Sequence, residues 1–153
     1  MKKLENKIPP PILMLLVAAS MWGVSKVQPA IAIEPRLHSA LTAALGAIAV
    51  LFGVGGIITF RLAKTTINPV QIDRASRVVS NGVYRITRNP MYVGLTGLLV
   101  TWSVFLAVPV TLLGPILFAM FTHRFQILPE ERVMSAKFGN DYDEYRNRVR
   151  RWL

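Results

Sequence analysis

The side chains best suited to holding a charged ligand fall in two short segments of the chain. Residues 82–94 carry Arg88 between two tyrosines, Tyr84 and Tyr92, and lead into a stretch without charge. Two adjacent glutamates, at positions 130 and 131, form the second segment. A guanidinium binds a carboxylate through paired hydrogen bonds, whereas a carboxylate accepts hydrogen bonds from an ammonium or a hydroxyl. The two segments together would suit a ligand that carries both a carboxylate and an ammonium.

A helix is predicted to begin within the first segment, at Asn89-Pro90. The Asn89 side chain is of the type that caps free backbone N–H groups, and proline fits the first helical position. These free donors and the helix dipole favour an anion bound beside Arg88. An alternative interpretation gives Arg88 and Tyr92 no ligand. They would then lie among lipid headgroups, where arginine and tyrosine orient a membrane span.

The composition excludes several kinds of site and partner. The chain of 153 residues has no cysteine, and its two histidines, His38 and His123, are far apart, so no metal site is expected. Hydrophobic residues make up 52% of the chain, and the charges that give a formal net charge of +10 lie between long apolar runs. Basic residues placed in this way favour anionic lipid headgroups over nucleic acid as partners.

Apolar runs predict an all-α, polytopic membrane protein with a single domain over residues 1–153. The clearest run, residues 39–60, has 22 residues, no charge and several glycines that favour close helix packing. The uncharged block 92–122 has 31 residues, about 46 Å as one helix, against a hydrocarbon core of about 30 Å. It must therefore fold back, and Pro109 and Pro115 are expected to interrupt it. Four transmembrane spans are predicted, at about 12–27, 39–60, 91–108 and 110–122, before a tail over 123–153.

The basic residues predict which ends of the spans share a face of the membrane. The N-terminal tail, the 61–89 connection and the tail after residue 122 hold 16 of the 18 Lys and Arg residues. Cytoplasmic loops are enriched in these residues, so both termini and the connection are expected in the cytoplasm. In the tail, we expect a break at Gly139 and a short cytosolic helix over 141–152, which would either lie on the membrane surface or fold back on the site. Its tyrosines, Tyr142 and Tyr145, are expected to be anchors in the interface.

The third and fourth spans form a predicted helical hairpin, which brings the two polar segments together. The third span starts on the face of the membrane where the fourth span ends, so residues 84–92 meet residues 124–145. Arginine and a helix N-terminus from one segment then face the carboxylates of the other. S-adenosylmethionine carries both a carboxylate and an ammonium and is a ligand of the kind that these groups would bind.

Three sequence blocks, in this order and with this spacing, resemble a known family. They are Gly-Val-Tyr-x-x-x-Arg-Asn-Pro-x-Tyr-x-Gly at 82–94, Glu-Glu at 130–131 and Phe-Gly-x-x-Tyr-x-x-Tyr at 138–145. Together they resemble the isoprenylcysteine carboxyl methyltransferase family, which shares its C-terminal pattern with the phospholipid N-methyltransferases. The resemblance implies an integral membrane methyltransferase that takes S-adenosylmethionine from the cytoplasm and a lipid-like acceptor from the bilayer.

The resemblance also implies which residues form the site. The family's Arg-His-Pro is Arg88-Asn89-Pro90 in this chain, and asparagine, unlike histidine, does not titrate near neutral pH. Arg124 falls where relatives carry an arginine just before the acidic pair, near the carboxylate of the acceptor, and it is the residue assigned to the reaction itself. The residues assigned to the cofactor are Tyr84, Arg88, Asn89, Tyr92, Gly94, Gly97, Glu130 and Glu131.

These patterns predict an enzyme that transfers a methyl group from S-adenosylmethionine to a lipid-embedded or small-molecule acceptor. The accepting atom belongs to a carboxylate, a thiol or an amine, so phospholipid N-methylation and small-thiol methylation are both open. A non-catalytic four-helix membrane scaffold is the alternative outside the enzymes. Membrane lipids are expected partners and nucleic acid is not, whereas the oligomeric state is open.

Overall fold

A computed structural model describes residues 5, 7–63 and 78–153, and the regular elements within these ranges are helices. The predicted all-α class is confirmed for this part of the chain. Residues 64–77, which make up much of the predicted polar connection, lie outside the described residues. In chain order the elements are α1 (Pro10–Ser25), α2 (Pro35–Leu62), η3 (Gly82–Arg85), α3 (Pro90–Leu106), η4 (Pro109–Leu112), α4 (Leu113–Thr122), η5 (His123–Ile127), α5 (Leu128–Phe138) and α6 (Asn140–Arg148).

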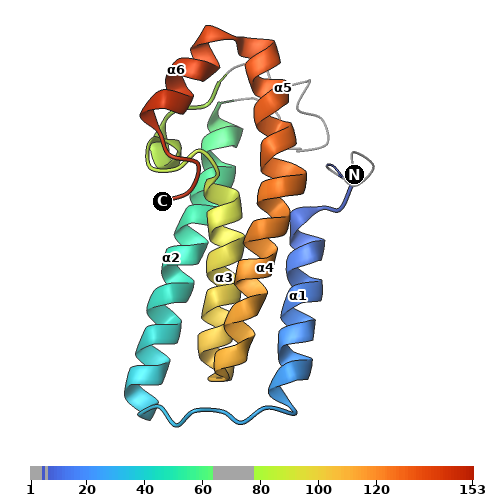
Figure 1. Ribbon diagram of the computed structural model, residues 1–153. Coiled ribbons are helices and arrows are strands. Elements are labelled where there is room, and N and C mark those ends of the chain that lie inside the picture. Colours follow the sequence, from blue (N-terminus) through green and yellow to red (C-terminus); the bar gives the residue numbers. More distant parts are fainter. Residues whose placement is uncertain (1–4, 6, 64–77) are drawn as a thin grey trace.

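Helices α1 to α4 stand side by side as a bundle, and α3 contacts each of the other three (Figure 1). Helix α5 continues α4 beyond the bundle, and α6 folds back toward η3 (Figure 1). One end of the molecule, which we call the polar end, therefore contains residues 78–90 and 123–153. The connection 26–34 and the turn between α3 and η4 lie at the opposite end (Figure 1). The predicted meeting of the two polar segments is thus confirmed.

The outside of the bundle is apolar. Within the described residues, α2 and the continuous helical stretch Pro109–Phe138 are long and apolar enough to cross a membrane, while α1 and α3 are apolar but shorter. Large side chains such as Leu51 and Leu117 expose 69% and 61% of their surface. Apolar surface of this extent suits the interior of a bilayer. That all four helices cross the membrane stays a prediction.

Small residues let α2 and α3 pack with their backbones almost in contact. A Cβ atom added to Gly94 would lie 2.7 Å from the Cα of Gly53 and 2.9 Å from the carbonyl oxygen of Ala49. A Cβ atom on Gly97 would lie 2.9 Å from the Cβ of Ala49. The prediction that glycines of the second span allow close approach is confirmed for Gly53 and for Gly56, which lies against the start of α3.

The hairpin between α3 and α4 turns near Pro109, as predicted. Ala107 ends α3 in the left-handed region, with φ of 52°, and Val108 is extended. The second expected interruption, at Pro115, is wrong, because this proline lies in the first turn of α4. Amide groups in a first helical turn have no partner within the helix, so proline is tolerated there.

The fourth helix does not end at residue 122, where the apolar run ends. Helices η5 and α5 continue it to Phe138 and carry the glutamate pair to the polar end. Pro129 has no N–H for a bond to residue 125, and the π-helical turn η5 directly precedes α5, where this proline lies. The break at Gly139 is confirmed, with φ of 53°. Helix α6 ends at Arg148 rather than near 152, because the last residues run beside the loop before α3.

Replacing Gly94 with alanine should destabilise the bundle by about 1–3 kcal/mol, because the new methyl group would meet the rigid backbone of α2. Gly23→Ala is the matched control, since a Cβ atom at Gly23 has nothing within 4 Å and alanine is favoured in a helix. Thermal unfolding in detergent micelles measures both variants. Equal stability of the two variants would contradict the close packing of α2 and α3.

Candidate functional site

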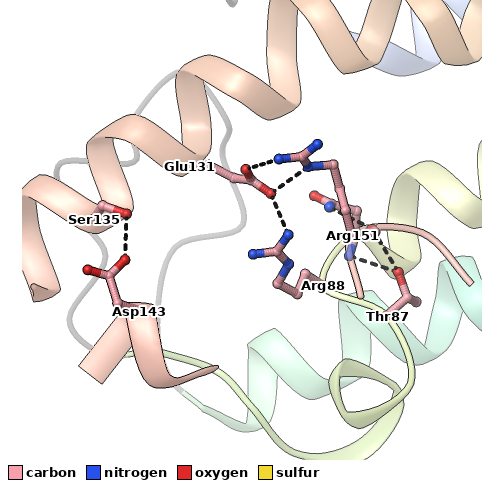
Figure 2. A network of polar contacts seen from close by, with 7 residues as sticks. Thr87, Arg88, Glu131, Ser135, Asp143 and Arg151 are labelled. Atoms are coloured by element: carbon pink, nitrogen blue, oxygen red, sulfur yellow. Dashed lines mark hydrogen bonds and ion pairs between the residues drawn. The ribbon is translucent and has the colours of Figure 1, made fainter. Parts of the chain in front are cut away.

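A buried carboxylate, that of Glu131, lies between two arginines at the polar end (Figure 2). Its Oε1 is 3.2 Å from Nη2 of Arg88, and Nε and Nη2 of Arg151 donate to its two oxygens at 2.9 and 2.8 Å. The side chains of Glu131 and Arg88 expose only 9% and 8% of their surface. These three residues, which we call the arginine–glutamate triad, carry a combined charge of +1. The triad therefore has an excess positive charge, and water reaches it mainly through Arg151, whose side chain exposes 33% of its surface.

The last residues of the chain hold Arg151 in position against the loop that precedes α3. The backbone N–H of Arg88 donates to the carbonyl of Arg150 at 2.9 Å, and Thr87 and Arg150 form a parallel bridge. The carbonyl of Arg151 accepts from Oγ1 of Thr87 at 3.1 Å and from Nδ2 of Asn89 at 2.9 Å. Thr87 is fully buried. The C-terminal segment is thus part of the site rather than a loose tail.

Asn89 lies at the predicted position before α3, but its side chain does not cap the helix. No side-chain cap bond is formed there, because Nδ2 of Asn89 instead donates to the Arg151 carbonyl. The backbone N–H of Asn89 donates to Oγ1 of Thr87 at 3.2 Å. The predicted capping role is therefore wrong, whereas the proline at the first helical position, Pro90, is confirmed.

Arg88 has hydrogen-bond donors to spare. Its Nε and Nη1 are buried and form no hydrogen bond of good geometry within the described residues, although the guanidinium lies close enough to the Tyr142 hydroxyl to act toward lowering the pKa of that phenol. Buried donors of this kind are nearly always paired in folded proteins, because an unpaired one costs about 1–3 kcal/mol and more when it is charged. Together with the excess charge of the triad, these donors fit an anionic group such as the carboxylate of a ligand.

Three tyrosines form a buried cluster at the polar end. The hydroxyl of Tyr145 donates to the carbonyl of Tyr84 at 2.8 Å, and the rings of Tyr142 and Tyr145 meet edge to face. Burial raises the pKa of all three phenols, and that of Tyr142 reaches about 12, with the nearby Arg88 guanidinium acting in the opposite direction. The expectation that Tyr142 and Tyr145 anchor the chain in the interface is wrong. Helix α6 folds back and leaves them only 6% and 4% exposed.

The two adjacent glutamates have different partners. Glu130 accepts a hydrogen bond of 2.5 Å from the hydroxyl of Tyr92, which joins α5 to α3. Glu131 is already bound to both guanidinia of the triad. A carboxylate that neutralises two arginines attracts a further cation only weakly, so Glu130 is the better placed of the pair for an ammonium.

Arg124 lines a cavity of about 480 Å³ that borders the triad. The sequence predictions included two of the lining residues but missed three other arginines. Those three belong to a tail rich in basic residues, and no spacing distinguishes them from the other arginines of that tail. The residues that line the cavity are Arg124, Leu128, Glu131, Arg132, Ser135, Arg146 and Arg151.

Two positions assigned to the cofactor from the sequence, Gly94 and Gly97, lie on α3 and face α2. The Cβ directions of Gly94 and Gly97 point at α2. A cofactor could therefore contact these glycines only from the opposite side of α3, and their assignment to a cofactor stays a prediction.

In η5, Nδ1 of His123 and Oε1 of Gln126 are buried without a partner among the described residues. Nε2 of Gln126 donates to the carbonyl of Ile8 at 2.7 Å and so ties the segment before α1 to η5.

The fold and the site together define an apolar helical bundle with a cluster of charged and hydrogen-bonded side chains at one end. The sequence model of the family described as phospholipid methyltransferase matches residues 37–141. The chain therefore belongs to the phospholipid methyltransferase family. A protein described as uncharacterized, from Haemophilus influenzae, is 40% identical over 63 residues, which are 41% of this chain and 100% of that protein.

Arg151→Gln should lower the thermal stability of the protein in detergent by about 1–2 kcal/mol, because it removes a forked pair of bonds to a buried carboxylate. Arg151→Lys should recover only part of this loss, since lysine keeps the charge but not the fork. Arg148→Gln, at an exposed position on α6, serves as the control and should change stability by less than about 0.5 kcal/mol. Equal effects at positions 148 and 151 would contradict the role given to the C-terminal segment.

Proposed function

We propose that this chain is an integral membrane enzyme that transfers a methyl group from S-adenosylmethionine to a lipid-embedded or small acceptor. The observation that carries the proposal is the buried guanidinium of Arg88, whose Nε and Nη1 are not used in the triad and form no hydrogen bond of good geometry within the described residues. Membership of the phospholipid methyltransferase family supports the reaction class. The proposed arrangement has four spans, with the polar end and both termini in the cytoplasm.

Arg88 and Glu130 are the proposed partners of the two charged groups of the cofactor. Arg88 would bind the carboxylate through its free nitrogens, while Glu131 and Arg151 hold its guanidinium in place. Glu130, which Tyr92 orients, would accept hydrogen bonds from the ammonium. Tyr84, Asn89, Gly94 and Gly97 complete the proposed cofactor site. When bound, S-adenosylmethionine supplies an electrophilic methyl group on a sulfonium.

The residues of this site would act by positioning and by excluding water. Methyl transfer is an in-line displacement, and holding the two reactants in near-attack geometry can supply about 7–11 kcal/mol in the best intramolecular cases. The buried tyrosines and the C-terminal segment restrict the entry of water, which keeps an acceptor nucleophilic. Arg124, in the wall of the cavity, would bind an anionic group of the acceptor.

The accepting atom is proposed at the level of its class only. A carboxylate or a thiolate reacts without a general base, whereas an amine must first lose a proton. The description of the matching family favours a phospholipid, whose headgroup would supply an amine. A carboxylate or small-thiol acceptor is the alternative within the same reaction class.

Calorimetry of the detergent-solubilised protein with S-adenosylmethionine and its demethylated product tests the cofactor site. Arg88→Gln, and at least one of Glu130→Gln and Glu131→Gln, should weaken binding by about 10- to 150-fold, the cost of losing a charged hydrogen bond. Arg124→Ala should stay within a few-fold of the unchanged protein and instead lower turnover.

Arg85→Gln provides the matched control, since Arg85 is exposed on η3 three residues before Arg88. It should bind the cofactor as the unchanged protein does. If the unchanged protein binds neither molecule, the methyltransferase proposal fails and a non-catalytic membrane scaffold becomes the better interpretation.

The proposed topology is tested by cysteines introduced into this cysteine-free chain. Ala30→Cys lies in the exposed connection between α1 and α2, whereas Ser80→Cys and Asn147→Cys lie at exposed positions of the polar end. An impermeant thiol reagent added to intact cells should label position 30 alone. Labelling of 80 or 147 under the same conditions would reverse or refute the orientation.

A further inference from the structure

Two buried hydrogen-bond acceptors in the π-helical turn η5 have no role in the site described so far. Nδ1 of His123 and Oε1 of Gln126 have no partner within the described residues. Gln126 exposes only 2% of its surface, and Thr122 and Ile127 on either side of the pair are fully buried. Buried polar atoms in folded proteins are nearly always paired. The two atoms therefore suit a bound group that can donate hydrogen bonds.

The segment before α1 fixes the direction of the Gln126 amide. Its Nε2 donates to the carbonyl of Ile8 at 2.7 Å, so the amide oxygen lies on the other side of the group and is free to accept. An amide oxygen offers no proton, and a carboxylate in contact with it would gain no hydrogen bond. An amine or an ammonium, which carries N–H donors, is the better match.

The pair lies between the proposed cofactor site and the apolar part of the bundle. Gln126 precedes Glu130 by four positions, and residues four apart lie on the same side of a helix. His123 lies seven positions before Glu130, about 10 Å along the axis of an α-helix, and directly follows the apolar helix α4. A lipid-embedded acceptor would approach from this side.

We propose that His123 is a further catalytic residue, which takes a proton from an amine of the acceptor, and that Gln126 holds this amine through its amide oxygen. The inference rests on the function proposed above and selects the amine from the acceptor classes left open there. Arg124, between the two residues in sequence, would bind an anionic group of the same molecule. Histidine suits the role because its imidazole takes up and releases protons near neutral pH.

The step needs a base because an ammonium nitrogen has no free electron pair. Nδ1 of His123 takes one proton from it, and the nitrogen then forms a bond to the methyl carbon of the cofactor. The bond between that carbon and sulfur breaks, and the sulfur keeps the electron pair and becomes neutral. The methylated nitrogen is an ammonium again, and His123 passes its proton to water. A positioned base contributes about 100- to 10,000-fold to such a rate.

Nitrogen NMR of the full chain, labelled at histidine, tests the contact with the amine. The chain has two histidines, and His38 is an internal control because its Nε2 lies 2.8 Å from the carbonyl of Val104, far from the polar end. The probes are dihexanoyl phosphatidylethanolamine and dihexanoyl phosphatidylcholine, whose nitrogen has no N–H. With the demethylated cofactor present, the first probe alone should shift the Nδ1 signal of His123, and neither should shift His38.

Two variants separate the proton acceptor from the residue that holds the amine. His123→Asn should lower kcat by about 100-fold or more and leave cofactor affinity within a few-fold, because asparagine can hydrogen-bond but cannot take the proton. Gln126→Leu should raise the KM of the acceptor by about three- to tenfold with a smaller effect on kcat. His38→Gln, which keeps a donor for Val104, is the control and should leave both constants unchanged.

A His123 signal that moves with both lipids or with neither overturns the proposal, since the first result indicates a change of packing and the second a buried water as the partner of Nδ1. Full turnover by His123→Asn overturns it as well. Failure of the unchanged protein to bind the cofactor contradicts the proposed function instead. The spectra recorded without cofactor then decide separately whether His123 meets an amine.

Discussion

The polar end of this protein depends on one buried carboxylate. Glu131 joins α5 to the loop before α3 through Arg88 and to the last residues of the chain through Arg151. Removing one partner of a buried ion pair typically costs about 3–5 kcal/mol, because the charge left behind has lost its counter-ion. Without Glu131, two guanidinia would face each other at the polar end. One side chain therefore joins three segments that are far apart in sequence, and the bonds of Arg88 and Asn89 to residues 150 and 151 reinforce this junction.

The polar end and the bundle are held together by different kinds of interaction. If the bundle lies in lipid, burial of apolar side chains gives little net gain, and helices associate through close packing of small residues. Gly53 and Gly94 provide such packing between α2 and α3. At the polar end, charged and hydrogen-bonded groups link η3, α5, α6 and the C-terminal segment. The bundle can thus act as a rigid base, and ion pairs orient the groups that would meet a ligand.

Much of the architecture could be predicted because it follows from local properties of the sequence. Pro109 and Gly139 mark real turns, and the pattern of apolar runs places the glutamate pair beside Arg88. The errors arise where a distant segment competes for a side chain. Asn89 has the chemistry of a cap, but the Arg151 carbonyl takes its amide. Whether Tyr142 is exposed depends on where α6 folds, which its own sequence does not determine. Arg151 is one of several arginines in a basic tail, and no neighbouring residue distinguishes it from the others.

The π-helical turn η5 rotates the side chains of α5 about the helix axis relative to those of α4. An α-helix turns about 100° per residue, and a π turn holds about one residue more than an α turn. Side chains beyond η5 are therefore rotated by roughly that angle from where an uninterrupted α-helix would present them. The side chain of Glu130 reaches Tyr92 from this rotated position, while the apolar face of α4 still packs on the bundle. The direction of the Glu130 and Glu131 side chains is thus set separately from the apolar outer surface of α4, so residues on that surface can change without redirecting the carboxylates.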